Sequence, residues 1–415
     1  MKQNEIRDAG LAESGRRKIE WVKGNMPLLN GLEKEYRNEK PFQGIKISLS
    51  VHLEAKTAYL CEVLAAAGAD MSVTGSNSLS TQDDVAAGLA ATGMKVYAVH
   101  GASPEEYSRH IEMALEHRPN IIIDDGGDLV GMVHGERPDL AEEVLGGCEE
   151  TTTGIIRLKA MEKQGILKFP MVAVNDARCK HLFDNRYGTG QSVWDSIMHN
   201  TNLIVASKTV VVAGYGWCSR GIAMRAASLG ASVIVTEIDP VKAIEARMDG
   251  FAVMKMADAA PLGDIFVSAT GCSGTISAEH ALTMKDGAIL SNAGHFDVEV
   301  DVAGIRQIAV EEKAARDNIT GYRLPNGRWV FIIAEGRLVN IAASNGHPAE
   351  IMDMSFAVQF LSALYILKNH ARLGNKVVDV SGEIDELIAR RKLQAWGIEI
   401  DRLTPEQESY LNSWK

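Results

Sequence analysis

The sequence lacks the features that mark secreted, membrane-spanning and metal-binding proteins. No positively charged start leads into an apolar run, so we expect no signal peptide. No run of about 18 apolar residues occurs, so we expect no membrane span. The cysteines number only 5, they are scattered, and none forms a CxxC pair. That pattern predicts a reducing, cytoplasmic environment and no structural metal site.

Positive charge is also in deficit. Lysine and arginine together number 43 against 54 aspartates and glutamates, which gives a formal net charge of −11. This charge argues against nucleic acid and anionic membrane as the main partners. Apolar residues, by contrast, make up 46% of the 415 residues, which is enough for the cores of about two or three domains.

The most informative stretch combines a glycine turn with flanking strand and helix patterns. In Val210–Gly221, VVVAGYGWCSRG, four apolar residues lead into the turn, a helical pattern follows, and Ser232–Thr236 is a second apolar run. This layout is typical of a dinucleotide-binding βαβ unit. Gly214 permits the tight turn, and Gly216 lets the backbone approach a pyrophosphate at the N-terminus of the helix. Glu237 is placed to accept hydrogen bonds from a ribose diol, which favours NAD over NADP.

One position departs from this dinucleotide fingerprint. Ser219 stands where the third glycine usually lies, and Gly221 follows it two residues later. Because a glycine pattern alone is a weak signal, a packing turn that binds nothing remains the alternative interpretation.

The first part of the chain alternates strand and helix patterns. Strand patterns at 45–51, 70–74, 95–99 and 120–123 are separated by helical patterns, which predicts a parallel, doubly wound sheet. The carboxyl ends of such strands lie at one edge of the sheet, where ligands bind. The polar residues that follow these strands are His52, Glu54, Lys56, Asn77, Ser80, Thr81, Gln82, Asp124, Asp125 and Asp128. They either converge on one cleft or are ordinary solvated loop residues.

Polar residues are also dense between positions 149 and 190. Glu150 and the threonines after it can cap the helix that follows them. Lys180 and Asp184 are four residues apart, which suits a helical ion pair or two groups that face a sugar diol.

Two later turns carry further candidate residues. SATGC (268–272) and SNAGHFD (291–297) follow strands of the dinucleotide domain, where a nicotinamide ring and its substrate would meet. His295 is there a candidate acid or base. Asn340 and His347 precede an apolar helical segment that we expect to pack back on the first domain.

Taken together, these motifs resemble the S-adenosyl-L-homocysteine hydrolase family over nearly the whole chain. The segments that carry the resemblance are STQDD (80–84), IIIDDGGDL (121–129), EETTTG (149–154), FDNRYG (183–188), VVVAGYG (210–216), TEIDP (236–240), NAGHFDVE (292–299), AEGRLVN (334–340) and GHP (346–348). The implied fold is α/β, with two doubly wound parallel-sheet domains joined by hinges. The implied parts are a substrate-binding domain (1–185 and 348–378), a Rossmann NAD-binding domain (190–346) and a helical C-terminal tail (379–415).

The resemblance implies a thioether hydrolase of the methyl cycle that uses NAD as a catalyst. In the family, the ribose 3′-hydroxyl is oxidised, the C4′ proton is removed, homocysteine leaves, water adds, and the 3′-ketone is reduced again. The resemblance also implies a cytoplasmic homotetramer. A non-catalytic nucleotide sensor and a dehydrogenase that releases NADH are the alternatives from other classes, and the full acid–base set speaks against a sensor.

The resemblance also assigns roles to individual residues. The implied catalytic residues are His52, Asp125, Glu150, Lys180, Asp184 and His295. The implied substrate-binding residues are Glu54, Lys56, Ser80, Gln82, Asn175 and His347. The implied NAD-binding residues are Thr151, Thr152, Thr153, Asn185, Gly214, Gly216, Ser219, Glu237, Lys242, Thr270, Gly271, Asn292, Gly294 and Asn340. Lys180 would help to take the 3′ proton, for which it would need a lowered pKa.

The expected purine pocket departs most from the family. Glu54 and Lys56 stand where the family usually has Thr and Glu, and that Glu accepts from the adenine amino group. Adenine presents a donor at position 6, whereas hypoxanthine presents an acceptor. S-adenosyl-L-homocysteine is the first expected substrate, and S-inosyl-L-homocysteine is the alternative if Lys56 faces position 6. Lys56 could instead simply pair with Glu54.

Overall fold

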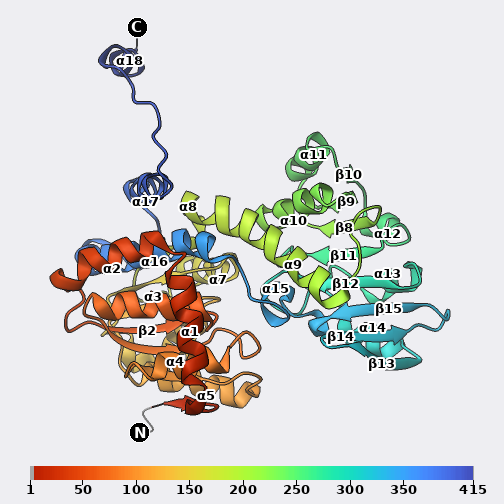
Figure 1. Cartoon of the computed structure of the whole chain (residues 1–415), viewed down its shortest axis with the longest axis horizontal. Coiled ribbons are helices and arrows are strands. Elements are labelled where there is room, and N and C mark those ends of the chain that lie inside the picture. The colour runs from red at the N-terminus through yellow and green to blue at the C-terminus, as the bar shows by residue number, and fades with distance from the viewer. Residues whose placement is uncertain (1–3, 415) are drawn as a thin grey trace.

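The computed structural model describes residues 4–414 as two α/β domains, each built on an eight-stranded sheet (Figure 1). The first sheet has the order β1-β4-β3-β2-β5-β6-β7-β16, and every pair of neighbours is parallel. Its strands are β1 (Glu5–Ile6), β2 (Lys46–Ser50), β3 (Asp70–Thr74), β4 (Lys95–Ala98), β5 (Ile121–Asp124), β6 (Gly146–Glu149), β7 (Met171–Ala173) and β16 (Val377–Asp379). The predicted parallel sheet is confirmed.

Helices cover both faces of this first sheet. They are α1 (Ala12–Lys23), α2 (Pro27–Glu39), α3 (Ala55–Ala66), α4 (Asp83–Ala90), α5 (Pro104–Leu115), α6 (Asp128–His134), α7 (Thr152–Lys163), α16 (Ala349–Asn369) and α17 (Gly382–Ala395). Helix α16 is long and apolar enough to cross a membrane by composition alone, yet 78% of its apolar window is buried inside the protein. It is therefore a core helix of the first domain. This agrees with the expectation that the apolar segment after His347 packs back on that domain.

The second sheet has the order β10-β9-β8-β11-β12-β15-β14-β13. Its strands are β8 (Thr209–Ala213), β9 (Ser232–Thr236), β10 (Ala252–Val253), β11 (Ile265–Ser268), β12 (Ala288–Asn292), β13 (Glu311–Arg316), β14 (Ile319–Arg323) and β15 (Trp329–Ile333). The strands from β10 to β15 are parallel, but β13 and β14 add an antiparallel edge. Its helices are α9 (Thr189–Thr201), α10 (Trp217–Ser228), α11 (Pro240–Met248), α12 (Met256–Ala259), α13 (Ala278–Thr283), α14 (Val302–Ile308) and α15 (Val339–Ala342).

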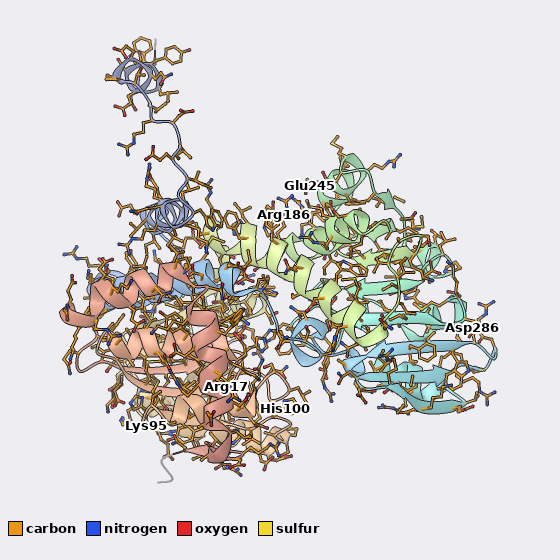
Figure 2. All side chains as sticks on the ribbon, viewed as in Figure 1. Arg17, Lys95, His100, Arg186, Glu245 and Asp286 are labelled. Atoms are coloured by element: carbon orange, nitrogen blue, oxygen red, sulfur yellow. The ribbon has the colours of Figure 1, made fainter. Side chains whose placement is uncertain are left out.

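Two links join the domains. The first is α8 (Arg178–Lys180), followed by a π-helical segment (His181–Gly188) that runs into α9, and the second leads from α15 back to α16. Figure 2 shows Arg186 on the first link, beside the second domain. A Cβ at Gly221 of α10 would lie 1.8 Å from the backbone oxygen of Arg186, so only glycine permits this close packing.

The segment expected as a C-terminal tail has two different parts. Helix α17 packs on the first domain, because Lys392 Nζ lies 3.0 Å from Asp353 Oδ2 of α16 and both side chains are buried. Helix α18 (Pro405–Leu411) instead extends away from both domains (Figure 1).

Candidate active site

Side chains from both domains meet at the carboxyl ends of the two sheets. His52 follows β2 and Asp125 follows the neighbouring strand β5, whereas His295 follows β12 of the second domain. His52 Nε2 lies 3.5 Å from Asp125 Oδ2, and His295 Nδ1 lies 4.0 Å from Asp125 Oδ1. The structure thus brings together three predicted catalytic residues that are far apart in the chain.

The charges in this first cluster are set by burial and by neighbours. Burial would raise the pKa of Asp125, but the imidazoles of His52 and His295 outweigh it and hold that pKa below its ordinary value. Ser76 Oγ also donates to Asp125 Oδ2 at 2.8 Å, which favours the charged carboxylate. Burial lowers the pKa of His52. A neutral imidazole that can accept a proton therefore faces an ionised carboxylate.

Lys180 is the centre of a second buried cluster. Its Nζ donates to Asn185 Oδ1 at 2.7 Å and lies 3.5 Å from a carboxylate oxygen of Glu150 and of Asp184. Asn175 Oδ1 lies 3.5 Å from Lys180 Nζ and accepts from Asn185 Nδ2 at 2.9 Å. The residues predicted to hold the ribose hydroxyls and the nicotinamide side therefore lie in one connected network.

The charges in this second cluster correct one expectation. Burial by itself lowers the pKa of Lys180, but the carboxylates of Asp184 and Glu150 outweigh it and raise that pKa above its ordinary value. Lys180 is therefore a protonated donor here, and the expected lowered pKa is not found. Burial raises the pKa of Glu150 to about 7, so this carboxyl can gain or lose a proton near neutral pH.

Three side chains from the second link and α16 complete the Lys180 cluster. His347 Nδ1 lies 2.6 Å from Asp184 Oδ1, and Ser355 Oγ donates to Asp184 Oδ2 at 2.6 Å. Gln359 Nε2 donates to Glu150 Oε2 at 2.5 Å. The sequence pointed to His347 but not to Ser355 or Gln359. The sequence signal that could have pointed to Ser355 and Gln359 is that both are polar residues within the mostly apolar helix α16.

Glu54 and Lys56 lie at the N-terminus of α3, and both are buried. Lys56 Nζ lies 2.7 Å from Glu54 Oε2 and donates to Asn345 O at 3.1 Å. Glu54 also accepts the backbone N–H groups of Lys56 and Thr57. Glu54 borders a cavity of about 190 Å³. The other residues that line this cavity include Leu79, Ser80, Gln82, His100 and Asn345. His100 lies on the side of the first domain that faces the second (Figure 2).

The glycine turn has the geometry of a phosphate-binding loop. Gly214 has a φ of +89°, a region that favours glycine. Gly216 is the residue before α10, and it offers no side chain to accept hydrogen bonds from the first N–H groups of the helix. The space that a Cβ at Gly216 would occupy is open. Ser219 Oγ donates to Ala269 O at 3.0 Å, so this serine ties the turn to the end of β11. Glu237 lies at the tip of β9 as predicted. These residues fit a dinucleotide pyrophosphate.

Glu299, which sequence reasoning missed, holds the two loops on the expected nicotinamide side. It accepts the N–H groups of Thr270 and Gly271, each at 2.8 Å. A Cβ at Gly294 would lie 1.8 Å from Glu299 Oε1, so the loop after β12 packs directly on this carboxylate. Asn340 Oδ1 is buried and accepts no hydrogen bond from the described part of the chain, and it is an acceptor of the kind that a carboxamide donor would satisfy.

The remaining predicted NAD contacts are spread over three elements. Thr151–Thr153 form the start of α7, where Thr151 caps the helix and Thr152 Oγ1 accepts from Asn175 at 3.0 Å. Asn292 ends β12. Lys242 lies on α11, with its Nζ 3.9 Å from Asp239 Oδ2. The sequence did not separate the capping role of Thr151 from a ligand-binding one.

Comparison with known proteins places this geometry in a family. The family model described as S-adenosyl-L-homocysteine hydrolase matches residues 3–145, and the model of its NAD-binding domain matches residues 185–346. The adenosylhomocysteinase of Pyrococcus abyssi is 57% identical over 99% of this chain and 97% of its own. The S-inosyl-L-homocysteine hydrolase of Methanocaldococcus jannaschii is 56% identical over 99% of both chains.

The chain belongs to the S-adenosyl-L-homocysteine hydrolase family. It is therefore a hydrolase with NAD as its cofactor, and the recognition of the family from sequence is confirmed. The family's NAD-binding match spans the second sheet, whose glycine turn and orphan Asn340 oxygen fit that cofactor. The adenosylhomocysteinase of Thermotoga maritima, 55% identical over 97% of this chain, shows that the two substrate names occur among relatives of nearly equal identity. Overall identity thus leaves the purine to be argued from the pocket.

Proposed function

We propose that this member of the family hydrolyses the thioether bond of an S-nucleosyl-L-homocysteine, reversibly, and that its favoured substrate is S-inosyl-L-homocysteine. S-adenosyl-L-homocysteine is the second candidate and is the one that sequence alone placed first. The observation that supports the choice of purine is the buried Glu54–Lys56 pair, of which Glu54 borders the cavity.

Hydrogen-bond capacity in this pair decides the argument. A carboxylate offers about four acceptor sites, and Glu54 already receives the N–H groups of Lys56 and Thr57 and the ammonium of Lys56. An ammonium has three donors, of which Glu54 and Asn345 take two. One acceptor site on Glu54 and one donor on Lys56 therefore remain, and we assign the Lys56 donor to position 6 of the purine. A charged donor suits the 6-oxygen of hypoxanthine and opposes the 6-amino group of adenine.

The Lys180 cluster is proposed to hold the ribose hydroxyls. NAD, when bound, supplies reversible oxidation of the 3′ carbon. Glu150 and Asp184 are placed to accept hydrogen bonds from a sugar diol, because both carboxylates lie 3.5 Å from Lys180 Nζ. A positively charged nicotinamide ring bound nearby would lower the pKa of Lys180, and a deprotonated Lys180 would then be able to accept the 3′ proton. Glu150, with a pKa of about 7, is a suitable neighbour to exchange that proton.

The cluster of His52, Asp125 and His295 is proposed to move the protons at C4′ and C5′. His52 is neutral and partly buried beside an ionised Asp125, so it can take a proton and be stabilised as a cation. Departure of homocysteine and entry of water at C5′ both need such a group. His295 approaches from the NAD domain, so the set is complete only when the two domains are closed.

The purine assignment is tested by the release of homocysteine from both compounds by the NAD-loaded protein. We expect a higher kcat/KM for the inosine compound. Lys56→Met should shift the kcat/KM ratio towards the adenosine compound by about 10- to 100-fold, because a donor–donor mismatch costs about 1–3 kcal/mol. Lys95→Met, which removes a lysine paired with Asp70 at the other end of the sheet, is the control. A wild-type preference for adenosine that Lys56→Met leaves unchanged would reject the assignment.

We also propose a cytoplasmic homotetramer. The family resemblance supports this assembly, and the 5 free cysteines in the described residues support a reducing compartment. Sedimentation of the NAD-loaded protein tests it, and a monomer at micromolar concentration would reject it.

A further inference from the structure

Asp125 has one carboxylate oxygen that accepts no hydrogen bond from residues 4–414. The side chain is 2% exposed, and its Oδ1 makes no hydrogen bond among the described residues. Its other oxygen, Oδ2, accepts from Ser76 at 2.8 Å. A buried, ionised oxygen without a donor is costly. It therefore marks a place where a positively charged group would be stabilised.

The hydrogen bonds of His52 turn a lone pair towards Asp125. Ser80 Oγ donates its only proton to Asn77 O at 2.7 Å. The same Ser80 Oγ lies 2.7 Å from His52 Nδ1, so it accepts the Nδ1 proton of the ring. In the neutral ring, Nε2 is then the unprotonated nitrogen, and it lies 3.5 Å from Asp125 Oδ2. His52 Nε2 and Asp125 Oδ2 are thus two hydrogen-bond acceptors that face each other with no proton between them.

His295 adds a third possible ligand from the second domain. One ligand atom from each of His52, Asp125 and His295 lies within 4.8 Å of the others. Gly126 leaves room for the ring of His295, because a Cβ at position 126 would lie 2.7 Å from His295 Nε2. The opposite nitrogen, Nδ1, is directed to Asp125 Oδ1 at 4.0 Å.

We propose that this cluster binds a divalent transition-metal ion such as Zn²⁺ and that the bound ion inhibits the enzyme. Two imidazoles and one carboxylate are ligands that suit Zn²⁺, which has Zn–N and Zn–O distances of about 2.0–2.2 Å. Tetrahedral bonds of this length put ligand atoms about 3.3 Å apart. The 3.5 and 4.0 Å separations and the imidazole–imidazole separation, which is within 4.8 Å, would therefore all have to contract, by up to about 1.5 Å, as the side chains close on the ion. A histidine that binds a metal through one ring nitrogen usually donates a hydrogen bond from the other, and Ser80 Oγ accepts that bond from His52 Nδ1.

The ion has a route to the site and an effect there. The His52 and His295 side chains are 14% and 12% exposed, so the cluster is reachable from solvent. A metal on His52 Nε2 occupies the lone pair that accepts a proton in hydrolysis. Inhibition therefore rests on the proposed function of this cluster, whereas metal binding does not.

Cobalt absorption tests binding without any turnover. We expect the NAD-loaded protein, titrated with Co²⁺ alone, to bind one ion with the intense visible bands of a four-coordinate site. His295→Asn and Asp125→Asn should each weaken that binding by at least about tenfold, because each removes one of three ligands. His199→Asn, which removes an exposed histidine elsewhere in the second domain, is the control. Absence of such bands, or equal binding by His295→Asn and the control, would overturn the proposal.

Inhibition is measured separately. Zn²⁺ should block homocysteine release in competition with the nucleoside substrate, and a chelator should restore it. If Co²⁺ binds at the cluster but Zn²⁺ leaves hydrolysis unaffected, the inhibitory role is refuted. If the protein binds Co²⁺ but never hydrolyses either thioether, the proposed function fails and the metal site stands.

Discussion

Asp385 is predicted to position Lys180, although it lies in the segment that sequence interpretation assigned to the C-terminal tail. Asp385 Oδ2 accepts the N–H of Arg178 and Oδ1 accepts the N–H of Cys179, each at 2.8 Å. Cys179 Sγ in turn donates to Asp385 O at 3.3 Å. These are the first N–H groups of α8, the helical turn that carries Lys180. A side chain of α17 thus caps the turn from which Lys180 reaches the site.

The structure sets the size of the expected effect of Asp385→Ala. Removal of the carboxylate leaves two N–H groups unpaired in a place where Asp385 is only 9% exposed. Loss of a cap costs about 0.5–2 kcal/mol, and hydrogen bonds to charged groups are worth about 1.5–3 kcal/mol. We therefore expect the free energy of unfolding to fall by about 2–3 kcal/mol. A displacement of about 1 Å at Lys180 should lower kcat by about 10- to 100-fold.

The assay compares kcat with stability in Asp385→Ala and in a matched variant of the same helix. Lys392→Met breaks the buried Lys392–Asp353 pair, whose other side-chain hydrogen bonds go to the backbone of α2 and α16. That variant should lose about 3–5 kcal/mol of stability while its folded fraction keeps nearly wild-type kcat. The reasoning is refuted if Asp385→Ala keeps wild-type kcat, or if Lys392→Met loses as much kcat.

Three further predictions concern the two clusters. Gly126→Ala should lower stability by about 1–2 kcal/mol because φ there is +107°, and it should lower kcat because the new Cβ displaces His295; urea unfolding and initial rates measure both effects. Glu150 binds its proton more tightly in the folded state, so stability should fall as pH rises from 4.5 to about 7, by up to about 3 kcal/mol, and Glu150→Gln should remove that slope in urea unfolding at several pH values. Lys180→Ala should abolish the absorbance of enzyme-bound NADH on addition of substrate, and full turnover would contradict its role.

Local patterns predicted the elements and the edge of the sheet where the site lies. The strands at 70–74 and 232–236 match β3 and β9 residue for residue. Parallel order then required His52 and Asp125 to share one edge, since β2 and β5 are neighbours. The glycine turn likewise predicted a helix after it, but the helical pattern begins at Ile222, whereas α10 begins earlier, at Trp217.

Contacts across long stretches of sequence could not be predicted in this way. Ser355 and Gln359 reach Asp184 and Glu150 only because α16 returns to the first domain after the whole second domain. The raised pKa of Lys180 has the same origin, since it depends on distances to two carboxylates and not on the spacing of residues. Resemblance to the family identifies which residues form the site, but the charge state of each residue depends on how the folded chain packs around it.

The two links between the domains are joined to each other inside the site. His347 of the second link lies 2.6 Å from Asp184 Oδ1 through Nδ1 and 3.2 Å from Thr189 Oγ1 through Nε2, and both partners belong to the first link or the helix it enters. A Cβ at Gly188 would lie 2.9 Å from His347 Nδ1, so the links pack closely. Asp184 also lies 3.5 Å from Lys180 Nζ. Rotation of one domain against the other must therefore either carry Asp184 with His347 or break their bond, and in both cases the electrostatic surroundings of Lys180 change. The pKa of Lys180 therefore depends, through the Asp184 carboxylate, on the contact between the two links.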